Sequence, residues 1–529
     1  MGASSHSAAL HPKAELGNDL VEVGGSPVIG AEVKMDARLS WTQGYDQFPY
    51  SVNVHFSNPT PFDVVYNNTN PNRPAYQALG NVNLVDPALY TEASGSNGSS
   101  RNRDMEYAAV ANLSLPLTLI GDDGELKFGG SMRRRSREAQ QYSADLVPVS
   151  QSLSDYVGGP DVFYYHNAYN IGPQPLYPKL LSIPQSPLAA DHTTFEHDDE
   201  NVCAGYVQYS ATFGDFDLVS GVRIETTDGT YRANTITTDT HGNTIITPNE
   251  ASHKYTNAFP DLSLKYQASD DLQFRVAFST AIARPGFNQI TAARSIDLQN
   301  ANPIITQGNP DLKPTLGRSF DLMASYFLPN QGIASIGLFY KAFTDYIVPT
   351  DQPSATDVLG FVGQSVDLIS YSNIGSAHAE GIELEYNQQF AFLPDPFGGL
   401  GFEGNLTIVQ SRGDIRPGES HTLPQTSPFN YNAGLFYGYG PVHLKIAAAY
   451  VTTNLWAVGG DASTDLYSQP RFRLDFGSTY DVTDEIQIYF DLKNITSTHL
   501  EFTQTNSKQF PVQNEFYGPD FLFGVRARL

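Results

Sequence analysis

The segment Leu272–Ser279, LQFRVAFS, alternates apolar and polar side chains residue by residue. One row consists of Leu272, Phe274, Val276 and Phe278, and the other of Gln273, Arg275, Ala277 and Ser279. Because successive side chains of a β-strand point to opposite faces, this period of two predicts a strand with one apolar and one wetted face. The charge of Arg275 indicates that the second face meets water.

The same alternation recurs along the chain in segments of about ten residues, as expected for strands that cross a bilayer. Ile486–Lys493, IQIYFDLK, repeats it, and so does the stretch from Phe216 to Glu225. The last segment carries the apolar row Phe521, Phe523, Val525, Ala527 and Leu529. These patterns predict an all-β protein.

Short and long connections alternate between these segments. Tight turns are expected at 121–124, 214–215, 269–271, 329–332, 394–399, 440–441 and 483–484. Long connections are expected at 145–199, 281–314, 344–371 and 454–469. Outer-membrane barrels have short turns on the periplasmic side and long loops outside, whereas a compact soluble domain rarely carries such loops. Counting from the strand through Leu39 and Trp41 gives about sixteen strands, so the sequence predicts a transmembrane antiparallel β-barrel.

Composition sets further limits on the class of protein. The chain has 529 residues and no uninterrupted apolar run of about 18, which excludes a spanning helix. A net charge of −25 argues against nucleic-acid binding, and the single cysteine, Cys203, permits no intrachain disulfide and no cysteine metal cage. Tyr and Phe number 30 and 31, which suits a bilayer interface or a Tyr-rich soluble sandwich. Met1–Leu20 contains no secretion signal, so the natural start is expected upstream or the chain is a fragment.

Several motifs carry a family resemblance. Ala283–Phe287, ARPGF, precedes Gly308–Pro314, GNPDLKP; Asn373 and Gly375 precede the GIELE of Gly381–Glu385; and Phe516–Leu529 closes the chain. In this order and spacing they resemble the TonB-dependent receptor family of outer-membrane transporters. Thr315 replaces the usual Glu, and the chain ends on Leu529 rather than Phe. The resemblance is specific over 104–529 and weaker over 1–103, which is expected to be the start of the barrel with a long outer loop.

The resemblance implies a 22-stranded barrel, so this chain would supply about sixteen strands and lack the N-terminal plug domain. It also implies energy-coupled uptake of a scarce nutrient, such as a siderophore or oligosaccharide, at the bacterial outer membrane. The implied partners are outer-membrane lipid, lipopolysaccharide, a small-molecule ligand, and an inner-membrane energy transducer that acts through the plug. A passive porin-like channel is the main alternative. A barrel enzyme and a soluble β-sandwich lectin are the others.

The loop 155–181 is the first candidate for ligand contact. Its aromatic residues include Tyr164, Tyr165, His166, Tyr169 and Tyr177. Such rings can stack on a sugar or another flat ligand, or can pack against neighbouring loops over the barrel mouth.

Two charged clusters are also candidates. Arg133, Arg134, Arg135 and Arg137 form a dense basic run that could bind an anionic ligand or lipopolysaccharide phosphate, or be balanced by nearby acids. Of these, Arg133 and Arg135 are proposed for ligand binding. His192 and the stretch 196–200, EHDDE, offer metal-type ligands, but they lack calcium-loop or zinc spacing, so no metal site is predicted.

No pattern of a catalytic site is present. The sequence contains no nucleophile elbow, phosphate-binding loop or dinucleotide fingerprint, so no enzyme activity and no cofactor are predicted. Pairs such as Arg223 with Glu225, and Glu383 with Glu385, are interpreted as polar ladders on the barrel interior.

Overall fold

The computed structural model describes residues 5–528 apart from 11–14, 26–27, 30–32, 61, 68, 70–74, 82–85, 147–151, 166–167, 181, 331 and 417. One large antiparallel sheet dominates it. The wall of this sheet consists of long strands, each paired with the next: β4 (Val33–Ser57), β7 (Glu92–Pro116), β8 (Asp123–Asp145), β11 (Ala189–Phe213), β12 (Phe216–Thr238), β13 (Thr244–Ser269), β14 (Leu272–Ala283), β17 (Thr315–Leu328), β18 (Gly332–Ala355), β19 (Val366–Gln389), β20 (Leu400–Arg416), β22 (Phe429–Tyr439), β23 (Val442–Val451), β26 (Arg471–Asp481), β27 (Ile486–Lys493) and β30 (Asp520–Ala527).

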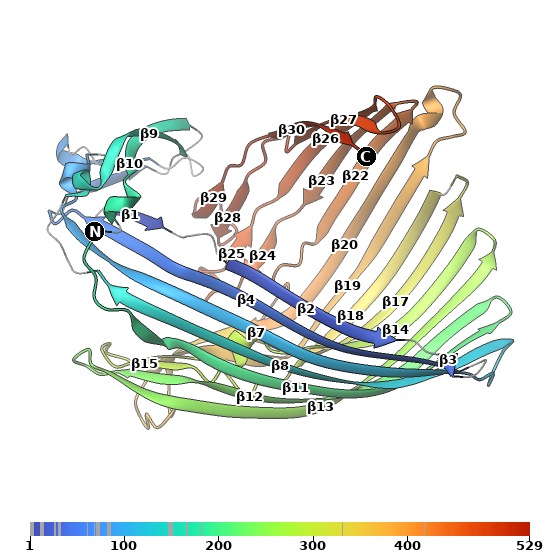
Figure 1. Cartoon of the computed structure of the whole chain (residues 1–529), viewed down its shortest axis with the longest axis horizontal. Helices are drawn as coiled ribbons and strands as arrows, with labels where there is room; N and C mark the ends of the chain where they lie inside the picture. The colour runs from blue at the N-terminus through green and yellow to red at the C-terminus, as the bar shows by residue number, and fades with distance from the viewer. Residues whose placement is uncertain are drawn as a thin grey trace.

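These sixteen described strands confirm the number predicted from the strand through Leu39 onward. Three shorter strands, β1 (Ser5–Leu10), β2 (Glu15–Gly25) and β3 (Val28–Ile29), pair one after another along the other edge of β4. In Figure 1, β4, β7, β8, β11, β12 and β13 run along the front, and β14, β17 to β20, β22, β23, β26 and β27 form the rear wall. The chain is therefore an all-β, antiparallel β-barrel.

The expected tight turns all lie at one end of the barrel. The loops between β11 and β12, β13 and β14, and β22 and β23 are two residues long, and Gly214 and Gly440 adopt positive φ there. Because glycine reaches positive φ without steric cost, it suits these hairpins. The turns expected near 121, 329, 394 and 483 are also present. By the asymmetry of outer-membrane barrels, this end is periplasmic.

The long connections expected over 281–314 and 454–469 are present between β14 and β17 and between β23 and β26, whereas the other two are shorter than predicted. β11 begins at Ala189, inside the loop expected over 145–199. β18 and β19 continue to Ala355 and from Val366, inside the loop expected over 344–371. These three strands reach 24 or 25 residues because the hairpins extend beyond the bilayer. There water lies on both faces, so the apolar–polar alternation that marks a spanning strand disappears.

Smaller elements collect at the end opposite the tight turns. They are β5 (Val64–Asn67) with β6 (Ala75–Ala78), β9 (Val157–Tyr165) with β10 (Ala168–Pro175), the four-stranded sheet of β24 (Asn454–Ala457), β25 (Leu466–Ser468), β28 (Leu500–Gln504) and β29 (Pro511–Glu515), the short strands β15 (Arg294–Asp297), β16 (Ile304–Gln307) and β21 (Glu419–His421), the helices α1 (Tyr177–Leu180) and α2 (Phe287–Ile290), and the 3-10 turns η1 (Leu79–Asn81), η2 (Pro87–Leu89) and η3 (Leu153–Asp155). A fourth 3-10 turn, η4 (Phe397–Gly399), lies instead in the tight turn between β19 and β20. In the described part of the chain, no helix combines the length and the apolar character needed to cross a membrane.

The outer loops have a core of their own. Val54 and Phe56 of β4 pack with Tyr90, Tyr156 and other buried apolar side chains contributed by the loops 58–91 and 146–188. Both Phe56 and Tyr90 are 1% exposed. This buried apolar cluster ties the described parts of these loops to the outer end of β4.

Candidate ligand-binding lumen

The outer face of the wall is apolar and exposed, as the alternation predicts. Phe274 and Val276 are 37% and 51% exposed, and Ile486 and Phe490 are exposed on β27. Large exposed apolar surfaces are rare on soluble monomers. This face therefore meets lipid, and the side chains between these rows face the lumen.

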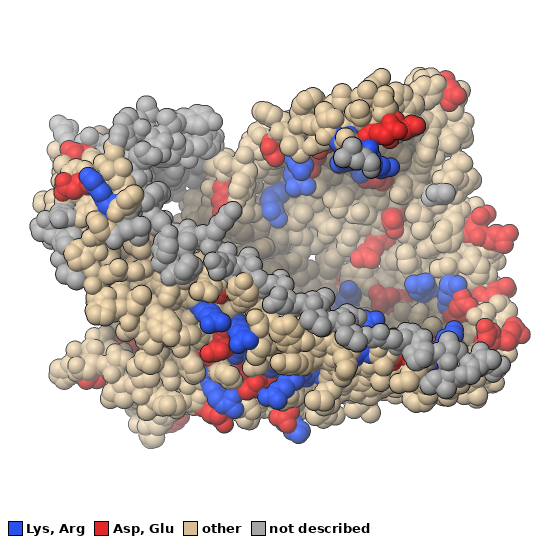
Figure 2. Space-filling model, viewed as in Figure 1, with Lys and Arg blue, Asp and Glu red and all other residues tan. Residues whose placement is uncertain are grey.

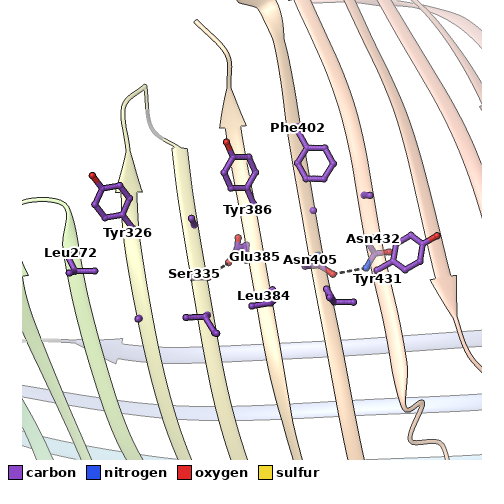
Figure 3. A pocket seen from close by; sticks show the side chains of 16 residues that line it. Leu272, Tyr326, Ser335, Leu384, Glu385, Tyr386, Phe402, Asn405, Tyr431 and Asn432 are labelled. Carbon is purple, nitrogen blue, oxygen red and sulfur yellow. Dashed lines mark hydrogen bonds between the residues drawn. The ribbon is translucent and has the colours of Figure 1, made fainter. Parts of the chain in front are cut away.

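A shallow groove of about 590 Å³ lies on the lipid-facing side of β14 to β22. Small residues form much of its floor, namely Ala324, Ala334, Gly404 and Ala433. Figure 3 shows Tyr326, Tyr386 and Phe402 around it, on β17, β19 and β20. By register with exposed Ile336 and Leu384, these small and aromatic residues are on the lipid face, so the groove does not belong to the ligand passage.

Ion pairs on the outer face mark where the lipid band ends. On β11 to β13, Asp228 pairs with Lys254 at 2.9 Å and Arg232 pairs with Asp199 at 3.0 Å. Asp228 and Arg232 are an even number of residues from lipid-facing Ile224 on β12, so both pairs lie on the outer face. The lipid band thus extends from the periplasmic turns to about residue 226 on β12. This is about ten residues per strand, the length a membrane-spanning strand needs.

Cys203 provides a natural probe of this boundary. It is exposed and registers with outward-facing Met132, just inside the lipid band. In liposomes we expect a lipid-soluble maleimide to modify Cys203 at least tenfold faster than a charged methanethiosulfonate, with mass spectrometry as the measurement. In urea the two reagents should react at similar rates. Preferential reaction of the charged reagent in liposomes would contradict the assigned lipid face.

The basic run is divided between the two faces. Arg133, Arg135 and Arg137 alternate with Arg134, and the register with β7 and β11 places the three odd-numbered arginines on the luminal side. Nε of Arg135 donates to both carboxylate oxygens of Asp104, at 2.9 and 3.0 Å. Arg133 lies 3.7 Å from both Glu106 and Glu200. The interpretation that nearby acids balance these charges is therefore confirmed, and their role in ligand binding stays a prediction.

A second luminal cluster is centred on Glu225. Nε of Arg223 donates to Oε1 at 2.5 Å, and Nη2 of Arg284 donates to Oε2 at 2.7 Å. Arg284 also donates to the Thr227 hydroxyl at 3.1 Å. The predicted Arg223–Glu225 ladder is thus present. Arg284, in the ARPGF motif, is a partner that spacing alone did not reveal because it comes from a different connection.

The acidic, His-containing stretch is split by strand alternation. His197 and Asp199 face outward, 3.4 Å apart, whereas Asp198 and Glu200 face the lumen. Throughout the described residues, no group of three or more His, Cys, Asp or Glu side chains is arranged to hold a metal ion. The stretch is part of a strand rather than a metal loop.

Asp198 is unusual within this wall. Its side chain is fully buried, and neither carboxylate oxygen has a hydrogen-bond partner among the described residues. It lies beyond the lipid band, above the level of Asp228. Burial first, and then the negative charge of Glu196, raise the pKa of Asp198 to about 7, against the lowering effect of Arg137. A buried, unpaired carboxylate is costly unless it is protonated.

Two luminal cavities lie on the rear wall, in the hollow visible in Figure 2. Their volumes are about 310 and 440 Å³, and both are lined by Glu385 and Asn405. Glu385 accepts from Ser335 at 3.3 Å, and Asn432 donates to Asn405 at 3.0 Å. Glu383 lines the larger cavity, which confirms the interpretation of Glu383 and Glu385 as interior polar residues. Carboxylates and amides of this kind suit a hydrated polar passage.

The aromatic loop forms a hairpin at the outer end, on the left in Figure 1. In β9 and β10, the backbones of Tyr164 and Tyr169 are directly paired. His166 lies outside the described residues, as do the side chains of Tyr164, Tyr165, Tyr169 and Tyr177. Ligand contact by these five residues remains a prediction.

An ion-pair clamp in the outer loops was not predicted from the sequence. Arg416, at the end of β20, donates to Asp465 at 2.6 and 2.9 Å and to Glu419 at 2.8 Å. Gly459 N–H donates to Asp465 at 2.9 Å. Asp465 is 1% exposed, and the clamp fixes the loop between β24 and β25 to the barrel wall. Arg416 and Asp465 are 49 residues apart, so no local pattern could reveal their pairing.

Comparison with known proteins adds a family and a fold. The chain matches the family described as "TonB dependent receptor-like, beta-barrel" over residues 24–495. No curated protein matches it.

Several solved structures share its architecture. The copper transporter OprC superposes with a TM-score of 0.52 at 12% identity, over 96% of this chain and 71% of that one. The ferric citrate transporter FecA in the unliganded form gives 0.50 at 11% identity, over 99% and 78%. The ferric-catecholate import receptor Fiu from K12 E. coli gives 0.49 at 10% identity, over 99% and 81%. At these identities the likeness to OprC and FecA shows the fold alone.

Proposed function

Because this chain belongs to the TonB-dependent receptor-like β-barrel family, we propose that it is the barrel of an energy-coupled receptor for a scarce nutrient. The family consists of outer-membrane receptors and transporters rather than enzymes, so the protein is a nutrient-uptake barrel of the bacterial outer membrane. The observation that carries the proposal is the wall itself. Its apolar outer rows suit lipid, and its luminal rows carry the ion pairs of Arg135 with Asp104 and of Arg223 with Glu225.

In this proposal the outer loops capture the ligand and the hydrated lumen passes it inward. An inner-membrane transducer would act through a plug seated in the lumen, against the polar ladder. A siderophore or an oligosaccharide is the proposed class of ligand. The solved structures of similar fold include transporters named for copper and for ferric citrate. The division into 1–103 and 104–529 stays a prediction.

Lipopolysaccharide is a further proposed partner. Of the basic run, Arg134 is on the outer face, above the lipid band and in register with Asn201. A guanidinium there can meet a lipid phosphate, since it pairs with such groups in a bidentate manner. The luminal Arg133 and Arg135 are on the wrong side of the wall for this partner.

Ligand binding by the hairpin of β9 and β10 tests the proposal. We expect saturable binding to one member of a panel of ferric siderophores, cobalamin and oligosaccharides, measured by calorimetry on protein in nanodiscs. Replacing Tyr164 and Tyr165 with Ala should weaken it about tenfold, since each lost ring contact is worth about 0.5–1.5 kcal/mol. Tyr439→Ala, at the periplasmic end, is the matched control and should leave affinity unchanged.

The channel alternative makes a different prediction. A passive pore would show no saturable binding to any panel member and would conduct ions through a planar bilayer without a transducer. Conductance together with an absence of binding would overturn the receptor proposal in favour of a porin-like channel.

A further inference from the structure

The segment Arg284–Ala293 crosses the luminal wall between β14 and β15, and we call it the strap. Its first anchor is Arg284, which is bonded to Glu225 and Thr227 of β12. Its last is the carbonyl of Ala292, which accepts from the Asn249 side chain at 2.6 Å. Between them Ile290 is buried against Tyr231 of the wall. The strap is thus docked on the lumen at the level of the outer mouth.

Phe287 is the centre of this docking. The guanidinium carbons of Arg135 and Arg137 lie 5.0 and 5.5 Å from its ring centroid, and Tyr231 meets it edge-on at 6.5 Å. Two cation–π contacts on one ring hold both arginines toward the strap. Arg135 keeps its bonds to Asp104 at the same time.

Asp198 lies in the middle of this arrangement, and neither carboxylate oxygen has a hydrogen-bond partner of normal geometry in the described part of the chain. The backbone N–H of Arg232 makes only the smallest contribution that lowers its pKa. The register pairs it with Arg137 on β8 and with Tyr231 on β12, the residues that flank Phe287. The charged groups that act on it are Glu196 and Asp199 of its own strand and Arg137. Arg137 is the cation closest in register, and its guanidinium is directed to Phe287 while both oxygens of Asp198 stay unbonded.

Arg137 thus has two competing partners, the Phe287 ring and the Asp198 carboxylate. We propose that the strap is a latch on the luminal wall, closed while Arg137 stacks on Phe287 and released when an ionised Asp198 takes Arg137 as its partner. The closed form buries the carboxylate and excludes water. The released form exposes it, restores an ion pair and clears the wall beneath the outer mouth.

The latch is therefore linked to protons. With the strap closed the pKa of Asp198 is about 7, whereas an exposed Asp beside Arg137 titrates at or below its ordinary value of about 3.9. Between about pH 4 and pH 7, Asp198 is therefore protonated in the closed form and ionised in the released form. Closure is strongest below about pH 4, weakens about tenfold per pH unit up to about 7, and levels off above it.

Cysteine accessibility measures the latch directly. In a Cys203→Ser background in nanodiscs, Ala292→Cys reports release because Ala292 is 3% exposed, and Asn288→Cys is the always-exposed reference on the same strap. The ratio of their alkylation rates by iodoacetamide cancels the pH dependence of the thiol. We expect this ratio to rise about a hundredfold from pH 5 to 7 and then to stay level to pH 8.

Three further variants test whether ionisation of Asp198 causes the release of the strap. Asp198→Asn should keep the ratio low at every pH, and Phe287→Ala should keep it high at every pH. Glu196→Gln, a gentler change, should move the start of the plateau to lower pH because it removes a charge that raises the pKa of Asp198. A flat ratio for the parent protein, a persistent rise in Asp198→Asn, or an unmoved plateau in Glu196→Gln would each overturn the proposal.

Discussion

Arg416→Met is expected to loosen the outer loop sheet by about 3–5 kcal/mol, because removing one partner of a buried ion pair leaves the other charge uncompensated. Asp465 is 1% exposed and takes two of its hydrogen bonds from Arg416. Without the guanidinium, this buried carboxylate must be protonated or become exposed. Hydrogen exchange of the paired strands β24 and β25 measures the effect, with protection expected to fall about a hundredfold or more.

Two variants separate charge from packing. Arg416→Met combined with Asp465→Leu removes both charges and should recover much of the lost protection. Glu419→Gln removes the exposed partner of Arg416 and should have a small effect, because solvent screens that pair. Equal losses in Arg416→Met and in the double variant would show that the clamp holds the loops by packing alone.

We also expect the stability of the outer loop sheet to fall in acid. Burial raises the pKa of Asp465, but the hydrogen bonds from Arg416 and Gly459 and the charge of Arg416 outweigh burial and lower it. The stabilisation is therefore present above the ordinary Asp pKa of about 3.9 and is lost as the pH falls through the lowered value. Protection of β24 and β25 should stay level from pH 8 to about 4 and drop below that. The double variant should lack this drop.

How far the sequence predicts this fold depends on where each strand meets lipid. Segments such as Leu272–Ser279 have hydrocarbon on one face and water on the other, so their alternation identifies both the strand and its inner face. The outer halves of β11, β18 and β19 have water on both faces, and their composition resembles that of loops. Hydrogen bonding to a neighbouring strand keeps them extended, and this pairing is invisible in a single segment.

Contacts in the lumen between residues that are distant in the sequence are equally hard to predict from a single segment. Alternation alone assigns Arg223 and Glu225 to one face, because they are two residues apart on one strand. It cannot show that Arg284 reaches the same carboxylate from a connection about 60 residues away. Nor can it show that the Phe287 ring contacts two arginines of β8. Asp198 has no sequence signal either, since its neighbours in the chain face the opposite side.

The assignment of faces can be tested on two adjacent residues of β17. Leu322 is 47% exposed on the lipid-facing side, in register with Val276 and Leu338. Met323, the next residue, is 36% exposed and lines a luminal cavity with Glu383. Leu322 lies six residues from the end of β17 at the periplasmic turn, near the middle of a span of about ten residues. The two side chains therefore share one depth and differ only in the medium they face.

Leu322→Arg is expected to destabilise the folded barrel by about 2–4 kcal/mol, the cost of placing Arg at the lipid midplane of such a wall. Met323→Arg should cost far less, because its guanidinium remains in water beside the luminal acids. Reversible unfolding in guanidinium chloride, followed by intrinsic fluorescence in lipid vesicles, gives both values. Equal destabilisation by the two substitutions would mean that β17 has no lipid face. A larger cost at Met323 would mean that the wall is turned inside out, and the luminal ladder, the latch and the proposed passage would then all face the bilayer.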